Sequence, residues 1–291
     1  MKTKARLGQN FLTDHGAAQR IVAALGDVSG RTVVEIGPGR GAITGGLAAR
    51  AGRVLAVELD RELVAGLRDR FPPDRVTVIH RDVLKFDFAA SFAEVSTERA
   101  KASRLCVVGN LPYYITSPIL LKLAASHSAI DCAVLMVQRE LADRVLASPG
   151  SRDYGVLSVT VQMYGSLERL FDLSPESFSP PPAVHSTVFR WNLEPRFAEL
   201  GVEEAAFLRF VRAAFAQKRK TLANNLRAAG IAPALASAGL AGTGLPPASR
   251  AETLSLEDFA MLWRFLDSKS AWGTNRRVQH RLSSGSKPQC E

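Results

Sequence analysis

Short apolar runs alternate with amphipathic segments along the first half of the chain. The apolar runs have the length and the Val, Ile and Leu content of buried strands; they are residues 32–36, 54–57, 76–79, 105–109 and 132–137. Apolar residues between the runs recur at helical spacing, which predicts helices at residues 14–25, 42–50, 60–71, 117–125 and 138–146. This alternation predicts an α/β fold with a mostly parallel sheet.

Two further strand candidates, residues 156–163 and 184–191, come late in this region. A proline-rich loop separates them, and the pattern places no long helix between them. A pair of this kind predicts antiparallel strands that close one edge of the sheet. Residues 86–103 form a variable stretch to which no element is assigned.

The pattern becomes helical after residue 203, with helices predicted at residues 203–216, 219–229 and 256–266. Ser255 and Asp258 have capping-box spacing at the start of the last helix. We therefore expect three parts. They are a large α/β domain at residues 1–195, a small all-helical domain at residues 203–267 and a disordered basic tail at residues 268–291.

Positive charge is concentrated toward the carboxyl end of the chain. The net charge is +9; residues 1–195 hold 23 Lys and Arg against 20 Asp and Glu, and residues 196–291 hold 14 against 8. A basic helical domain beside a nearly balanced one favours a polyanionic partner, although a basic face can also be an ordinary solvated surface.

The cysteines and histidines show no spacing typical of a disulfide framework or a metal site. Cys106 and Cys132 lie in apolar runs, where we expect small core residues in a reducing cytoplasm, and Cys290 lies in the tail. The N-terminus has no apolar stretch long enough for export, and no segment approaches the roughly 20 apolar residues of a membrane span. A soluble cytoplasmic protein without a metal is expected.

Polar or glycine-rich groups follow the predicted strands of the first half. The segment Gly37-Pro38-Gly39-Arg40-Gly41 can bring backbone amides close to a ligand, and Glu58, 21 residues after Gly37, can accept hydrogen bonds from ribose hydroxyls. Asp82 follows the third strand, where it can accept a hydrogen bond from an adenine amino group. Such groups meet at one edge of a parallel sheet. This predicts a nucleoside ligand; the glycine spacing also leaves a nicotinamide enzyme open.

The segment Asn110-Leu111-Pro112-Tyr113 follows the strand at residues 105–109. It combines a side-chain amide, carbonyls that the proline holds in place and an aromatic face, and this set can grip an amino group. A simple strand-ending turn is the alternative, since Asn and Pro are common in turns.

With these motifs the chain resembles the ribosomal RNA adenine N6,N6-dimethyltransferases, and more closely the small-subunit (16S) enzymes than the antibiotic-resistance enzymes that act on 23S rRNA. The resemblance spans residues 9–226 and rests on Gln9-Asn10-Phe11-Leu12, the segment from Gly37 to Ala42, Glu58, Asp82, the segment from Asn110 to Ile115, Phe178 with the prolines after it, and Lys218-Arg219-Lys220-Thr221-Leu222.

The resemblance implies a Rossmann-like S-adenosylmethionine-dependent methyltransferase sheet and a role for each matching residue. The expected cofactor-binding residues are Gln9, Asn10, Leu12, Gly37, Gly39, Gly41, Glu58, Asp82 and Asn110. The expected catalytic segment is Asn110, Leu111, Pro112 and Tyr113, with Phe178 as a second ring that stacks on a flipped adenine. The expected RNA-binding residues are Lys2, Lys4, Arg6, Arg209, Arg212, Lys218, Arg219, Lys220 and Arg227.

The implied function is S-adenosylmethionine-dependent dimethylation of two adjacent adenosines near the 3′ end of 16S rRNA, carried out by a monomer on an immature small ribosomal subunit. Two alternatives remain: a 23S rRNA dimethyltransferase of the resistance type, and an RNA-binding assembly factor without catalysis. The chain departs from the family at Arg81, where glycine is frequent, and at His185, where aspartate is frequent. Its stretch at residues 89–104 is long, and we identify no family counterpart for its tail after Ser268.

Overall fold

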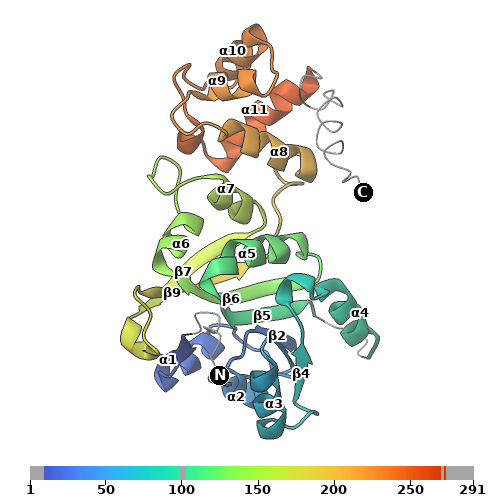
Figure 1. Ribbon diagram of the computed structural model, residues 1–291. Helices are drawn as coiled ribbons and strands as arrows, with labels where there is room; N and C mark the ends of the chain where they lie inside the picture. Colours follow the sequence, from blue (N-terminus) through green and yellow to red (C-terminus); the bar gives the residue numbers. More distant parts are fainter. Residues whose placement is uncertain (1–9, 99–102, 270–271, 273–291) are drawn as a thin grey trace, which may run out of the picture. The chain divides into compact units, whose positions relative to one another are not determined.

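A computed structural model describes residues 10–98, 103–269 and 272 (Figure 1). Lys2, Lys4, Arg6 and Gln9 lie outside these residues, as does most of the predicted tail, including Cys290. The chain divides into two compact units, one made of Met1–Ala147 and Val161–Pro195 and the other of Ser148–Thr160 and Arg196–Glu291. We refer to them as the sheet unit and the helical unit.

The sheet unit is built on seven strands in the order β4 (Val76–His80), β3 (Arg53–Glu58), β2 (Thr32–Ile36), β5 (Leu105–Asn110), β6 (Ile130–Gln138), β9 (Ser186–Asn192) and β7 (Ser166–Leu173). The first five are mutually parallel, while β9 runs antiparallel to both β6 and β7. The predicted parallel sheet with an antiparallel edge is therefore confirmed.

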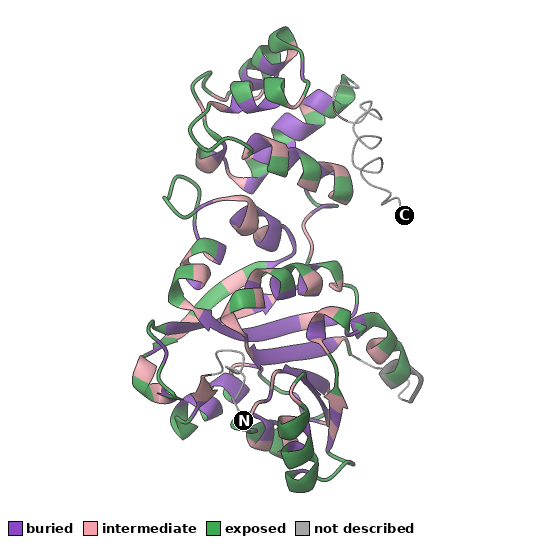
Figure 2. Cartoon of the chain, in the orientation of Figure 1, coloured by how far each residue is buried: buried purple, intermediate pink, exposed green. Residues whose placement is uncertain are grey.

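The sheet is buried on both faces, as its continuous apolar strands require. Every residue of β2 is buried, and so are the last five residues of β3 (Figure 2). The helices that alternate with the strands are α1 (His15–Ala23), α2 (Thr44–Arg50), α3 (Arg61–Arg70), α4 (Phe88–Glu98), α5 (Thr116–Ala125) and α6 (Arg139–Val145). Figure 1 shows α5 on the opposite side of the sheet from α2 and α3. The stretch without an assigned element contains α4.

Cys106 and Cys132 occupy neighbouring positions on β5 and β6. Both are free and buried, and their Sγ atoms lie 3.5 Å apart. Their prediction as small core residues is confirmed.

The strand predicted at residues 156–163 is wrong, because this segment forms helix α7 (Val156–Met163). The edge strand is β7, eight residues long with half of its residues exposed, and its pairing with β9 shifts register between Arg169 and Phe171, so its sequence shows no regular apolar alternation. Gly165 makes the change of direction between the two elements. Its φ is +151°, and a Cβ there would overlap the carbonyl oxygen of Asn192 on β9, so only glycine fits.

A second, two-stranded sheet joins the beginning of the described chain to the proline-rich loop. β1 (Phe11–Leu12) pairs antiparallel with β8 (Phe178–Ser179), and Leu12 lies opposite Phe178. The Thr13 amide donates to the Ser177 carbonyl over 2.9 Å and extends this contact. Two segments that the sequence separates widely are thus fixed together beside the sheet.

The helical unit contains α8 (Glu204–Ala214), α9 (Leu222–Ala228), α10 (Pro233–Gly242) and α11 (Leu256–Ser268). The capping box before α11 is confirmed: Ser255 Oγ accepts from the Asp258 amide and Asp258 Oδ2 accepts from the Ser255 amide, each over 3.0 Å. The prediction missed α10, whose small residues give no helical stripe. None of the described helices is long and apolar enough to cross a membrane.

Residues 148–160 cluster with the helical unit, although the predicted boundary placed them in the first domain. The Tyr154 ring packs edge-on to Phe215 with centroids 6.3 Å apart, and the Gly150 amide donates to the Glu252 carbonyl over 2.7 Å. An aromatic core holds the unit together, and its members include Phe207, Phe210, Phe259 and Trp263. Trp272 packs against Phe210 and donates to the Ala206 carbonyl over 3.0 Å.

Candidate active site

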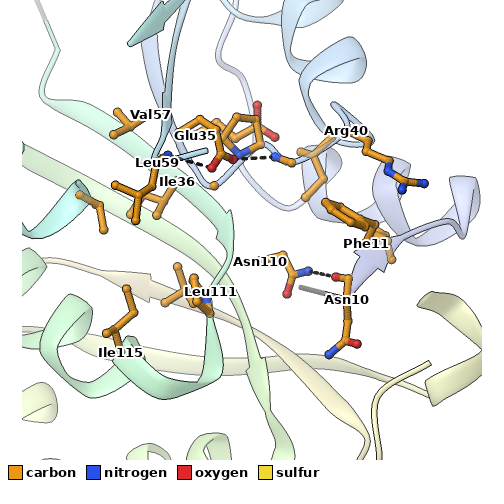
Figure 3. Close-up of a pocket in the computed structure, with 18 of the residues that line it drawn as sticks. Asn10, Phe11, Glu35, Ile36, Arg40, Val57, Leu59, Asn110, Leu111 and Ile115 are labelled. Atoms are coloured by element: carbon orange, nitrogen blue, oxygen red, sulfur yellow. Dashed lines mark hydrogen bonds between the residues drawn. The ribbon is translucent and has the colours of Figure 1, made fainter. Parts of the chain in front are cut away.

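A pocket that is partly open to solvent lies at the carboxyl ends of the parallel strands (Figure 3). The strand order changes direction between β2 and β5, and an open parallel sheet binds its ligand at such a point. Five segments line the pocket, at residues 10–12, 35–43 without Gly41, 57–59, 81–83 and 110–115. They bring together ten of the predicted site residues: Asn10, Leu12, Gly37, Gly39, Glu58, Asp82, Asn110, Leu111, Pro112 and Tyr113.

The glycines after β2 let the backbone form the pocket wall. Gly37, Gly39 and Gly41 all have positive φ, between +57° and +78°. A Cβ on Gly39 would come within 3.0 Å of the Phe11 ring, and one on Gly41 within 2.9 Å of the Phe71 ring. Gly41 is not among the residues that line this pocket; its positive φ and the side chains of Leu67 and Phe71 beside it both favour glycine there.

Glu58 ends β3 as a buried carboxylate held by three backbone amides. Its Oε1 accepts from Leu59 over 2.8 Å and from Asp60 over 2.9 Å, and its Oε2 accepts from Gly39 over 3.2 Å. These bonds fix the carboxylate and tie it to the glycine segment. Leu59 beside it is 47% exposed and lines the pocket, so an apolar face adjoins a fixed acceptor.

Asp82 begins a short 3₁₀ turn, Val83–Lys85, and its Oδ1 accepts from the Leu84 amide over 2.9 Å. Its other carboxylate oxygen receives no hydrogen bond from the described residues. Arg81, one of the departures from the family pattern, lines the pocket through an exposed side chain, and its amide donates to the Glu58 carbonyl over 2.9 Å. The ends of β3 and β4 are therefore connected beneath the pocket.

Glu35 is a pocket residue that the sequence reading missed. It is fully buried in β2, where Thr44 donates to its Oε2 over 2.6 Å. Burial raises the pKa of Glu35 to about 7; the Thr44 hydrogen bond opposes this, and the charge of Glu58 adds to it. A lone carboxylate inside an apolar strand was the available signal, because such a group is rarely buried without a reason.

Asn110 has its side-chain orientation set by the beginning of the chain. Its Nδ2 donates to the Asn10 carbonyl over 3.1 Å, as Figure 3 shows. Because this bond assigns the nitrogen to Asn10, the opposite atom of the amide, Oδ1, is left as an acceptor. The side chain thus presents an oxygen within the pocket that contains the ends of β2 and β5.

The backbone after Asn110 is equally constrained. The Leu111 amide donates to the Met136 carbonyl over 2.9 Å, and the Pro112 carbonyl accepts from the Thr116 hydroxyl over 2.9 Å and the Ile115 amide over 3.2 Å. No described residue donates to the Leu111 carbonyl. The segment therefore holds a side-chain oxygen and a neighbouring backbone oxygen, both without donors among the described residues, on a fixed turn.

Tyr113 and Phe178, the two predicted stacking rings, have different surroundings. Tyr113 lines the pocket half-buried, with its hydroxyl 3.3 Å from Ser186 Oγ. Phe178 is only 3% exposed, belongs to the hydrophobic core beside Leu12 and does not line the pocket. The structure gives Phe178 a packing role, and its stacking on a base stays a prediction that requires this ring to leave the core.

The predicted basic residues of the helical unit form an exposed set. Arg209 and Arg212 lie on α8, Arg227 lies on α9, and Lys218-Arg219-Lys220 occupies the connection between these helices. All six side chains are exposed, and none forms an ion pair with a described residue. Their cationic groups are therefore available to an anionic partner.

Asn225, which lies between Lys220 and Arg227 in the sequence, is buried at 2% exposure. Its Nδ2 donates to the carbonyls of Ala214 over 2.7 Å and Gln217 over 3.2 Å, and its Oδ1 accepts from the Gln217 amide over 3.1 Å. Asn225 thus pins the connection that carries the three consecutive cations. No three His, Cys, Asp or Glu side chains of the described segments converge as a metal site would require.

Comparison with known proteins agrees with this arrangement. The sequence profile described as "Ribosomal RNA adenine dimethylase" matches residues 1–267. The chain belongs to this family. A protein from Acidobacterium capsulatum called ribosomal RNA small subunit methyltransferase A is 54% identical over 270 residues, 92% of this chain and 93% of that protein. The enzyme is thus a ribosomal RNA adenine dimethyltransferase with a methyltransferase sheet.

Two solved structures share the fold. A dimethyladenosine transferase from Plasmodium falciparum has a TM-score of 0.74 at 23% identity, over 90% of this chain and 98% of that one. The 23S rRNA methyltransferase ErmE has a TM-score of 0.67 at 25% identity, over 89% of this chain and all of its own (100%). The fold expected from the sequence is therefore confirmed.

A methyltransferase needs a methyl donor, and the pocket fits one that carries an adenosine. Glu58 is a fixed carboxylate acceptor, Leu59 is an exposed apolar side chain, and Asp82 keeps one carboxylate oxygen without a donor from the described chain. The glycine segment supplies space that a Cβ would fill. These groups match a ribose, a purine face, a purine amino group and a charged extension.

Proposed function

We propose that this enzyme transfers methyl groups from S-adenosylmethionine to the N6 atoms of two adjacent adenosines near the 3′ end of 16S rRNA. The observation that carries the proposal is the Asn110 amide, whose orientation by Asn10 leaves Oδ1 as an acceptor next to the Leu111 carbonyl. Two acceptors on one rigid turn suit an amino group with two N–H bonds.

Glu58, Asp82, Leu59 and the glycine segment would hold the cofactor, which supplies an electrophilic methyl group on a positively charged sulfur. The Asn110 oxygen and the Leu111 carbonyl would accept the two N6–H bonds of adenine. Holding both hydrogens out of the ring plane makes the nitrogen more tetrahedral and directs its lone pair at the methyl carbon. The new N–C bond would form as the S–C bond breaks, the electron pair of that bond would stay on sulfur to give neutral S-adenosylhomocysteine, and the nitrogen would release one proton to solvent.

This chemistry depends on position rather than on a strong base. After the first transfer the nitrogen keeps one N–H bond, so one acceptor still orients it while the second methyl group is added. The base must leave its stack to enter the pocket, at a cost of a few kcal/mol. The half-buried Tyr113 ring supports the proposal as a stacking face that offsets part of this cost.

The six exposed cations of the helical unit would bind RNA phosphates, and the pocket would select the base. A small-subunit substrate is supported by the relative at 54% identity, whose name specifies the small subunit, while the 23S enzyme is 25% identical. We further infer that the enzyme acts in the cytoplasm on immature subunits; the free thiols of Cys106 and Cys132 suit a reducing compartment.

The test is methylation of separated ribosomal subunits. Small subunits that lack the modification are incubated with the enzyme and labelled S-adenosylmethionine, large subunits are the parallel control, and modified nucleosides are mapped by mass spectrometry. We expect N6,N6-dimethyladenosine at two adjacent positions of 16S rRNA. Label confined to the large subunit would support the 23S function, and a complete absence of label would support the non-catalytic assembly factor.

A further inference from the structure

Tyr114 places an aromatic ring at the opening of the pocket. Among the described residues, five large hydrophobic side chains are exposed, and Tyr114 at 59% is the most exposed of them. It also lines the pocket, which of the other four only Leu59 does. A single exposed hydrophobic side chain is common at protein surfaces; Tyr114 is singled out because it is aromatic and also lines the pocket.

The backbone under Tyr114 is rigid. Tyr114 is the middle residue of the 3₁₀ turn Tyr113–Ile115, which Pro112 precedes with φ at −60°. The Pro112 carbonyl closes this turn by accepting from the Ile115 amide and the Thr116 hydroxyl. Tyr113 is tethered near Ser186 by its hydroxyl, whereas no described residue forms a hydrogen bond with the Tyr114 hydroxyl. A fixed backbone thus presents a ring that packing does not use.

The proposed substrate offers a matching surface. When one of two adjacent adenosines enters the pocket, its neighbour on the strand loses a stacking partner and exposes one face of its base. Tyr114 follows Tyr113 on the same turn, so it lies one residue away from the ring that contacts the flipped base. An aromatic side chain can stack on such an exposed base face, and this contact does not depend on which base is present.

We infer that Tyr114 stacks on the nucleobase next to the adenosine that occupies the pocket. The inference rests on the proposed function and deepens it. Tyr114 is a substrate-positioning residue that holds the RNA strand at the pocket opening while Asn110 and Leu111 hold the reacting amino group. Because stacking ignores base edges, the same ring serves both rounds of modification.

Four single variants test this role: Tyr114→Ala, Tyr114→Leu, Tyr114→Phe and the control Leu121→Ala. Leu121 is a 41% exposed hydrophobic residue on α5 of the same unit and does not line the pocket. KM and kcat are measured with unmodified small subunits, alongside cofactor affinity and thermal unfolding. We expect Ala and Leu to raise the KM for subunits about tenfold with kcat within about twofold, as loss of one stacked base predicts.

Tyr114→Phe keeps the ring and should behave like the wild type, as should Leu121→Ala. A wild-type KM in Tyr114→Ala, a loss confined to kcat, or equal behaviour of the Leu and Phe variants would overturn the inference. The Leu and Phe pair decides the matter even if the Ala variant does not fold. If the wild-type enzyme itself does not methylate small-subunit adenosines, the proposed function fails instead.

Discussion

The pocket and the six exposed cations of the helical unit hold their polar groups in opposite ways. In the pocket, Glu58 accepts hydrogen bonds from three backbone amides, Asp82 accepts one from a backbone amide, and the Asn110 side chain donates one to the Asn10 carbonyl. On the helical unit, six cations project from the surface without a described ion-pair partner. The difference matches two tasks. Groups that must position reacting atoms within a fraction of an ångström are held in place by hydrogen bonds, whereas charged side chains that attract a phosphate chain can change conformation.

The strongest challenge to this comparison is Asn110→Ala. The change removes one of two acceptors from the pinned set, and we expect kcat to fall about 1000-fold because the amino group loses its orientation. Rates are measured with labelled S-adenosylmethionine and unmodified small subunits. Cofactor affinity and thermal unfolding serve as controls and should change little. Turnover close to that of the wild type would contradict the assigned role of Asn110.

Glu35→Gln tests how a buried carboxyl group changes the free energy of unfolding with pH. The pKa of Glu35 is raised to about 7 by burial, so its folded-state pKa exceeds its unfolded value. The stability that this group contributes is then fully present below about pH 4.5 and is lost as the pH rises through 7, by about 3 kcal/mol in all. The amide of the variant cannot ionise, but its oxygen can still accept from Thr44. Urea unfolding at several pH values should show the stability of the variant rising relative to that of the wild type between about pH 4.5 and pH 7. If the free energies of unfolding of the two proteins change with pH in parallel, the assignment is wrong.

Among the exposed cations, the triple change Lys218→Ala, Arg219→Ala and Lys220→Ala should weaken RNA binding about 30-fold. It should also lower the slope of log Kd against the logarithm of the salt concentration by about 2. Unfolding should be unaffected because these side chains are exposed. The matched control removes three exposed cations of the sheet unit, in Arg61→Ala, Arg75→Ala and Lys85→Ala. Equal losses of RNA affinity in both triple variants would mean that net charge, rather than the positions of Lys218, Arg219 and Lys220, controls binding.

Asn225→Ala is expected to have the smallest effect. Asn225 is a buried residue whose hydrogen bonds hold the connection that carries Lys218, Arg219 and Lys220. Losing three hydrogen bonds in a buried site should lower the free energy of unfolding by about 2 kcal/mol and loosen the connection. RNA affinity should fall severalfold with an unchanged salt slope, because no cation is removed. The neighbouring exposed residue provides the control, and Asn224→Ala should alter stability by less than about 0.5 kcal/mol.

The sequence predicts the centre of the sheet well because its strands are buried on both faces. β2 coincides with the predicted residues 32–36, and the other parallel strands differ from prediction by two residues or fewer at their ends. At the edge this signal fails. α7 has the β-branched composition of a strand but forms a helix, and β7 is an edge strand whose apolar residues do not alternate regularly with polar ones. Tertiary position, not local propensity, decides these two elements.

The motifs of the pocket also follow from the sequence, because strand ends in a parallel sheet converge. The sequence does not reveal contacts between distant segments. The family resemblance implies that Phe178 stacks on a base, but its pairing with β1 places it in the core beside Leu12. Asn225 lies among basic residues in the sequence, and only the structure shows that it is buried and forms three hydrogen bonds with the backbone. Glu35 gives a charge signal that could have been used, yet its bond to Thr44 needs the folded structure.

The bond between Asn10 and Asn110 has a consequence for the timing of synthesis. The Asn10 carbonyl belongs to a segment that is held in place by β8, near residue 178, so the first part of the chain to be made is seated late. During translation the whole cofactor pocket can emerge from the ribosome before its catalytic amide is aimed. The catalytic amide is therefore oriented only after the segment near residue 178 has been made and has paired with β1.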